Sequence, residues 1–98
     1  MVYSLSIAEA AEDDIREAYL WYEEQQSDVG NSFEKEISNA VDSIKENPLK
    51  SQIQYGDMRV FFLKKFPYGV HFIVSGNNIL IVAVFHTSRA PKNWEKRK

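Results

Sequence analysis

The spacing of apolar residues changes once along this chain, near Pro48, and this change limits the folds that it can adopt. Before Pro48, residues 8–26 and 30–47 carry apolar side chains every three or four positions, which is typical of amphipathic helices. Only four residues, 27–30, break the pattern, so we expect an antiparallel helical hairpin. Asn47 ends the second helix, because the residue before a proline disfavours helical geometry.

Strand signals lie on both sides of this helical region. Residues 2–7 alternate apolar and polar side chains, and residues 57–66, 70–74 and 79–85 are rich in β-forming residues. The order predicts an α+β fold with an N-terminal strand, the helical hairpin and a three-stranded antiparallel meander. We expect the hairpin to pack on one face of a four-stranded sheet, with residues 1–98 as one domain. The expected core is drawn from both helices and the sheet: Ile15, Tyr19, Phe33, Ile37, Val41, Ile44, Val60, Phe62, Phe72, Val74, Ile81 and Ala83.

The charges are divided between the two halves of the chain. Residues 1–47 carry twelve acidic and three basic residues, whereas residues 48–98 carry two acidic and nine basic residues. The formal net charge of −2 hides this separation. A basic half attracts phosphates or an acidic partner, although acidic helices beside basic sheet edges would give the same count.

Composition argues against several classes of site. The chain has no cysteine, and His71 and His86 are too few for a histidine-rich zinc site. We therefore expect no metal, and the absence of a glycine-rich phosphate loop leads us to expect no cofactor. No apolar run reaches membrane-spanning length and the N-terminus lacks a leader pattern, so we expect a cytoplasmic protein that does not enter a membrane.

Two histidines and three aromatic residues of the first helix are the next residues to consider for function. His86 directly follows the apolar run 79–85, where a rigid strand end meets solvent and favours functional residues. A capping histidine in a solvated C-terminus is the structural alternative. His71, inside a strand, is expected to be a satisfied strand histidine. The aromatic side chains of the first helix, Tyr19, Trp21 and Tyr22, are expected to pack rather than to form a base-stacking platform.

Three groups of residues occur in order along nearly the whole chain. They are Asp14 to Tyr22 followed by Phe33; Arg59 upstream of Phe66-Pro67-Tyr68; and Val84, His86, Arg89, Pro91 and Trp94. Together they resemble the ParE/RelE superfamily of small bacterial toxins, often called plasmid-stabilisation proteins. The resemblance implies the fold predicted above and a cognate antitoxin that wraps the toxin. A homodimer through an exposed sheet edge is the alternative partner.

The resemblance leaves the mechanism open. The closing residues Ser88 to Pro91 lack one base and one acid that the family usually carries, and no tyrosine follows Tyr68, unlike in ribonucleolytic members. The chain is therefore closer to the ParE-like branch, which implies a toxin that binds DNA gyrase. The alternatives are a metal-independent endoribonuclease of RelE type, which cleaves mRNA on the ribosome, and an inactive relative.

The endoribonuclease hypothesis assigns chemical roles to three residues, whereas in the binding mechanism no residue does chemistry. In an endoribonuclease His86 would transfer protons, and Arg59 and Arg89 would hold the phosphate. In the structural alternative His86 caps the last strand and Arg59 pairs with an acid of the hairpin. The expected binding residues for a partner are basic or aromatic: Lys64, Lys65, Lys92, Trp94, Lys96 and Arg97. The alternative for Trp94 is an anchor that folds back on the sheet.

Overall fold

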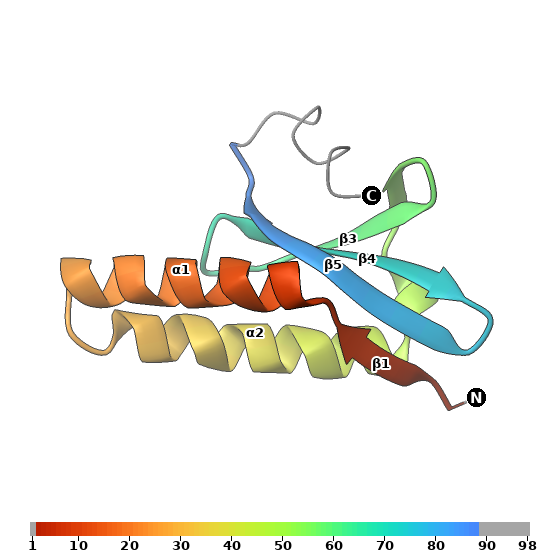
Figure 1. The fold of residues 1–98 in the computed structure, drawn as a ribbon, viewed down its shortest axis with the longest axis horizontal. Helices are drawn as coiled ribbons and strands as arrows, with labels where there is room; N and C mark the ends of the chain where they lie inside the picture. Colours follow the sequence, from red (N-terminus) through yellow and green to blue (C-terminus); the bar gives the residue numbers. More distant parts are fainter. Residues whose placement is uncertain (1, 89–98) are drawn as a thin grey trace.

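Helices and strands follow the predicted order, with one additional strand (Figure 1). The computed structural model describes residues 2–88. Within them, no helix is long and apolar enough to cross a membrane. The elements are β1 (Ser4–Ile7), α1 (Glu9–Gln25), α2 (Val29–Glu46), the 3-10 turn η1 (Pro48–Lys50), β2 (Ile53–Tyr55), β3 (Met58–Phe62), β4 (Tyr68–Ser75) and β5 (Asn78–His86).

The strands form one five-stranded sheet in the order β1-β5-β4-β3-β2. β1 runs parallel to β5, and the other neighbouring pairs are antiparallel. Because β1 and β5 lie far apart in the sequence, the chain between them is long enough for a parallel pairing. The expected count of four strands is wrong by one: β2 is only three residues long and mostly exposed, so it carries no apolar alternation.

The helical hairpin is confirmed, and local features explain its ends. Glu9 and Glu12 lie in the first turn of α1, where carboxylates interact favourably with the positive end of the helix dipole. Asp28 reverses the chain in a left-handed conformation with φ of 71°. At Gly30 the helices approach closely, because a Cβ there would lie 2.5 Å from Glu23 Cγ. Glycine is therefore required for this contact.

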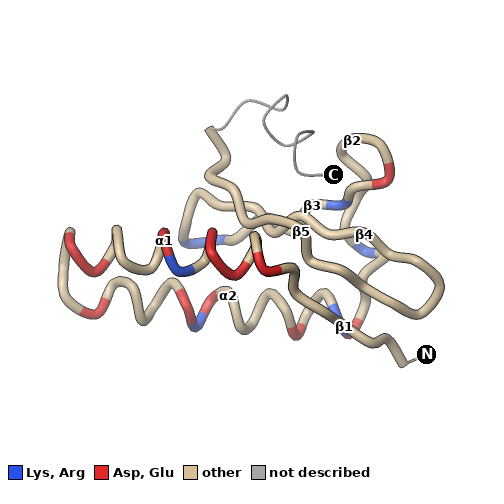
Figure 2. The backbone as a smooth tube through the Cα atoms, in the orientation of Figure 1, with Lys and Arg blue, Asp and Glu red and all other residues tan. Residues whose placement is uncertain are grey.

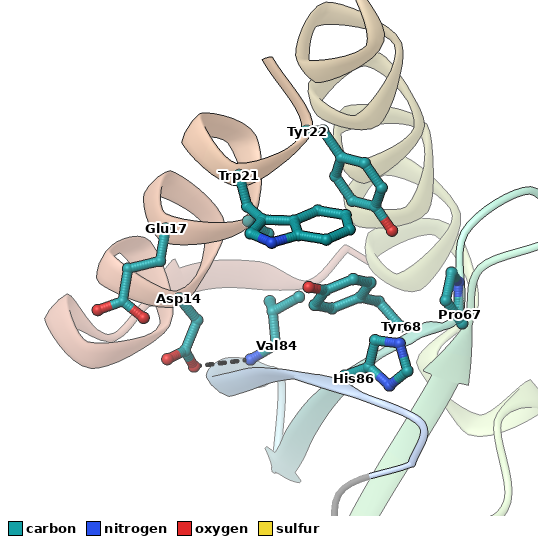
Figure 3. Close-up of a pocket in the computed structure, with 9 residues that line it drawn as sticks. Asp14, Glu17, Trp21, Tyr22, Pro67, Tyr68, Val84 and His86 are labelled. Carbon is teal, nitrogen blue, oxygen red and sulfur yellow. Dashed lines mark hydrogen bonds between the residues drawn. The ribbon is translucent and has the colours of Figure 1, made fainter. Parts of the chain in front are cut away.

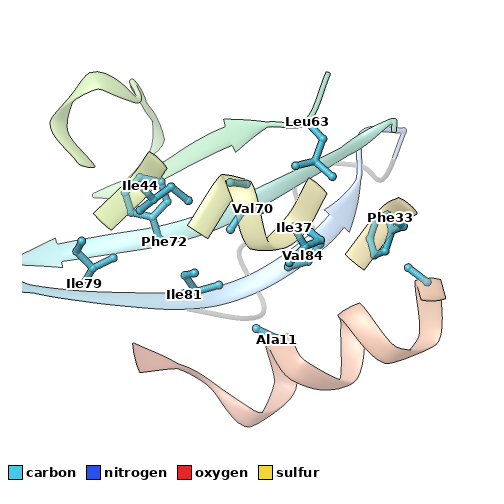
Figure 4. Close-up of a cluster of buried hydrophobic side chains, with 12 residues drawn as sticks. Ala11, Phe33, Ile37, Ile44, Leu63, Val70, Phe72, Ile79, Ile81 and Val84 are labelled. Carbon is cyan, nitrogen blue, oxygen red and sulfur yellow. The ribbon is translucent and has the colours of Figure 1, made fainter. Parts of the chain in front are cut away.

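The core lies between the hairpin and one face of the sheet (Figure 4). Some expected core residues are buried within this cluster: Phe33, Ile37, Ile44, Phe72 and Ile81. Others are half-buried against it: Ile15, Val41 and Val74. Tyr19 is half-buried at the hairpin beside Gly30. Phe62 was wrongly placed in the core, since its side chain is 48% exposed. Its neighbour Phe61 packs on the core, and successive strand side chains point to opposite faces.

The second face of the sheet is also apolar and carries the buried histidine. Val60 and Ala83 are buried at positions paired with His71, on the face opposite to Phe72. His71 Nδ1 lies 2.9 Å from the Tyr55 hydroxyl oxygen. The prediction of a satisfied strand histidine is confirmed. Burial of the imidazole lowers the pKa of His71 to about 4.

Candidate functional site

A pocket of about 430 Å³ lies where α1 passes the ends of β4 and β5 (Figure 3). It combines carboxylates, aromatic rings and one histidine. The residues that line it are Asp14, Glu17, Ala18, Trp21, Tyr22, Pro67, Tyr68, Val84 and His86. Of the site residues predicted from the sequence, His86 is the one that the described structure places in this pocket.

His86 ends β5 directly beside Tyr68, its register partner on β4. The two ring centroids lie 5.2 Å apart in an edge-on arrangement. Nδ1 accepts the backbone N–H of Ser88 at 3.1 Å, and the Ser88 hydroxyl oxygen lies 2.7 Å from the same nitrogen. Because a backbone N–H can only donate, the ring hydrogen lies on Nε2. His86 therefore caps the turn after the strand while its ring faces the pocket.

Asp14 joins α1 to the exposed edge of β5. The pairing of β1 with β5 ends at Ile81, so β5 continues beyond its neighbour. Asp14 Oδ2 accepts the Val84 N–H at 3.0 Å and so satisfies a donor on that open edge. Glu17 stands one turn further along the same helix, and its exposed side chain also lines the pocket (Figure 3). The helix thus places two carboxylates along the pocket, and the hydrogen bond to Val84 holds that of Asp14 in position.

Aromatic rings form the opposite part of the pocket. The Tyr22 ring centroid lies 5.0 Å from that of Trp21 and 6.2 Å from that of Tyr68. Tyr22 packs against the core as expected, and burial, together with the nearby Tyr68, raises the pKa of its hydroxyl. The expectation that Trp21 is packed is wrong, because its side chain is 54% exposed. One step along a helix turns a side chain by about 100°, which carries Trp21 off the buried stripe.

Arg59 lies elsewhere in the sheet. Its guanidinium donates to the Ser51 carbonyl at 2.6 Å and reaches the Leu49 carbonyl at 3.5 Å. It pairs in register with Phe72, whereas His86 pairs with Tyr68, so a strand and several residues separate the two. The described structure does not bring Arg59 to His86. Its partners are backbone carbonyls and not the acid of the hairpin considered from the sequence.

Lys64 and Lys65 follow β3 in an exposed loop that α2 holds in place. Glu36 Oε2 on α2 accepts both backbone N–H groups, at 2.7 Å from Lys64 and 3.1 Å from Lys65. Both side chains are exposed, so the loop presents two cations from a fixed backbone. The other predicted site residues lie outside the described residues: Arg89, Lys92, Trp94, Lys96 and Arg97.

The described residues of the pocket suit some chemistries better than others. Asp14 and Glu17 line it, and no lysine or arginine does so within residues 2–88. A phosphate beside His86 would therefore meet two carboxylates, an unfavourable arrangement of like charges. Metal ligands are not gathered either: nowhere in this part of the chain do three His, Asp or Glu side chains converge.

Comparisons with known proteins agree with this architecture. A family model described as the ParE toxin of the type II toxin–antitoxin system parDE matches residues 5–91. Among solved structures, the fold is similar to one described as a chromosomal ParDE TA system from P. aeruginosa, with a TM-score of 0.78. That match has 18% sequence identity and covers 87% of this chain and 96% of the other. A comparison with curated protein sequences found no match.

Proposed function

Because this chain belongs to the ParE toxin family of parDE type II toxin–antitoxin systems, we propose that it inhibits growth by binding DNA gyrase without chemistry of its own. Family membership makes it the toxin component and gives it an antitoxin as partner. The gyrase target and the absence of a catalytic step are the proposal. The cleavage of mRNA is the competing mechanism.

The surroundings of His86 carry this proposal. Cleaving RNA through its 2′-hydroxyl needs a base, an acid and cations that stabilise the charge on phosphorus. In the described residues the ring of His86 faces a pocket with Asp14 and Glu17, and Nδ1 already accepts the N–H of Ser88. Arg59 is bound to two backbone carbonyls at another part of the sheet. This arrangement supports a toxin that acts by binding.

We place the target-binding surface on the basic half of the chain. Lys64 and Lys65 are exposed on a loop that Glu36 anchors, so their charges are available to a partner. The remaining members of the proposed surface are Lys92, Trp94, Lys96 and Arg97. Exposed cations mainly steer association, and we expect this binding to weaken as salt is raised.

Expression in a bacterial host tests the proposal against mRNA cleavage. The proteins compared are wild type, His86→Ala and the double variant Lys64→Glu/Lys65→Glu. The matched control is Lys35→Glu/Lys45→Glu, which reverses two exposed lysines on α2. Growth, plasmid supercoiling and the integrity of ribosome-bound mRNA are followed together, and circular dichroism checks that each variant is folded.

The proposal predicts altered supercoiling with intact mRNA. His86→Ala and the α2 control should inhibit growth as wild type does, and the Lys64/Lys65 variant should inhibit less. Cleaved mRNA that becomes intact with His86→Ala would overturn the proposal and support an endoribonuclease. A folded wild-type protein that changes neither supercoiling nor mRNA would identify an inactive relative.

A further inference from the structure

The pocket beside His86 combines two carboxylates with three aromatic rings, and this combination selects a kind of ligand. We infer that it binds an arginine side chain presented by a segment of the cognate antitoxin. The inference rests on the toxin assignment above. It adds the chemistry by which this pocket recognises the antitoxin.

Charge is the first reason. Asp14 and Glu17 line the pocket without a lysine or arginine from the described residues. Arg16, their neighbour on α1, instead contacts Asp13 at 3.3 Å. The Glu17 carboxylate makes no hydrogen bond or ion pair with any residue in 2–88. The pocket therefore carries negative charge that attracts a cation and repels a phosphate.

The aromatic walls are the second reason. Trp21, Tyr22 and Tyr68 gather on one side of the pocket, beside Asp14 and Glu17, and the Trp21 side chain is 54% exposed (Figure 3). A cation over the face of such rings is attracted by their quadrupoles, and tryptophan is the best partner. The planar guanidinium of arginine also stacks on rings while it donates to carboxylates. Arginine satisfies both features of the pocket at once.

Other ligands fit less well. An apolar side chain would make no favourable interaction with the charges of Asp14 and Glu17. An anion would face both carboxylates. Two of the lining side chains are also held in place before binding, since Asp14 accepts the Val84 N–H and His86 accepts the Ser88 N–H. A preformed pocket loses little ordering entropy when its ligand enters.

The antitoxin is the occupant that the charge distribution favours. Asp and Glu residues lie mainly along α1 and α2 (Figure 2), and the pocket opens beside α1. The cations proposed for the target, Lys64 and Lys65, lie on a separate loop. A cationic antitoxin residue can thus dock at the acidic helices. An acidic segment of the same antitoxin can cover the basic loop.

An NMR titration of the full-length protein tests the ligand chemistry. The probes are N-acetyl-arginine amide and N-acetyl-citrulline amide, which has a similar shape but no charge. The indole N–H signal of Trp21, assigned with Trp21→Phe, reports binding. We expect a saturable shift with the arginine probe and roughly tenfold weaker binding of the citrulline probe. Glu17→Gln should weaken the binding of the arginine probe. Glu34→Gln, which removes an exposed carboxylate on α2, should leave that binding unchanged.

Three results would overturn the inference. They are equal binding of the two probes, no saturable shift, and a shift that Glu17→Gln leaves unchanged. Binding that appears only after Arg89→Gln or Lys92→Gln would assign the pocket to the chain's own cations and overturn the antitoxin as occupant. Neither probe involves gyrase, so a failure here is separate from a failure of the proposed target.

A double-mutant cycle on the toxin–antitoxin complex tests the occupant. Each arginine of the antitoxin is changed to glutamine, and its affinity for wild-type toxin and for Glu17→Gln is measured. For one arginine, the change to glutamine should lower the affinity of the antitoxin for wild-type toxin roughly tenfold or more. The same change should lower its affinity for the Glu17→Gln toxin much less. Losses that are independent of Glu17 for every arginine would overturn the antitoxin as occupant.

Discussion

Acidification should destabilise this protein through one buried imidazole, that of His71. The side chain is 1% exposed, and its ring centroid lies 5.1 Å from that of Phe85. A protonated ring would carry a charge into these surroundings, where Tyr55 supplies one hydrogen-bond contact at 2.9 Å. Burial therefore lowers the pKa of His71 from its usual 6.5 to about 4 in the folded state.

The direction of the change in stability with pH follows from proton uptake by the folded and the unfolded states. Above pH 6.5 His71 is mostly neutral in both states and does not affect stability. As the pH falls from 6.5 towards 4, the unfolded chain takes up a proton that the folded chain does not, so the free energy of unfolding decreases. These two pKa values give a loss of about 2 kcal/mol between pH 7 and pH 5, and about 3 kcal/mol when complete.

Urea unfolding at several pH values measures this loss. The comparison is between wild type and His71→Gln, whose side chain does not titrate and still offers Tyr55 a hydrogen-bonding partner. Carboxylates contribute equally to both proteins, so the difference between the two pH curves isolates His71. Wild type should lose about 2 kcal/mol more than the variant between pH 7 and pH 5. Parallel curves for the two proteins would show that His71 does not cause the loss of stability.

Three substitutions test the packing by urea unfolding at neutral pH. Phe33→Ala should lower the free energy of unfolding by about 3–5 kcal/mol because the ring is fully buried; a cost as small as that of the exposed control Phe62→Ala would contradict this. Gly30→Ala should cost about 1–3 kcal/mol, since its Cβ would meet Glu23, and an unchanged midpoint would show that the hairpin can open there. Arg59→Ala should cost about 1.5–3 kcal/mol, because the carbonyls of Ser51 and Leu49 lose a charged donor, and an unchanged free energy of unfolding would contradict this.

The sequence predicts the elements with long, regular patterns. The apolar stripe that includes Phe33 and Ile44 marks α2, and the run from Ile79 to Phe85 marks β5, because a stripe or run of this length has one stable way to be buried. β2 was not predicted, because three residues are too few to show the alternation of apolar and polar side chains that marks a strand. The exposure of Phe62 was not predicted, because its apolar character does not indicate which face of β3 it occupies.

The pocket is harder to predict because tertiary contacts assemble it. Asp14 meets Val84 across 70 positions of sequence, and no local pattern encodes that contact. One signal was available: Asp14, Glu17 and Trp21 are spaced by three and four residues and so share a helix face beside the apolar stripe. His86 was predicted as a site residue from its place at a strand end, and the structure adds the partners that surround it.

The supercoiling reaction of purified DNA gyrase distinguishes a toxin that binds gyrase from one that cleaves mRNA. Relaxed plasmid, gyrase and ATP are incubated with increasing amounts of the toxin, and the same preparations are added to translating ribosomes with a defined mRNA. We expect inhibited supercoiling and intact mRNA, equally for wild type and His86→Ala. Unaffected supercoiling, together with mRNA cleavage that His86→Ala abolishes, would contradict the proposal that this toxin acts by binding gyrase.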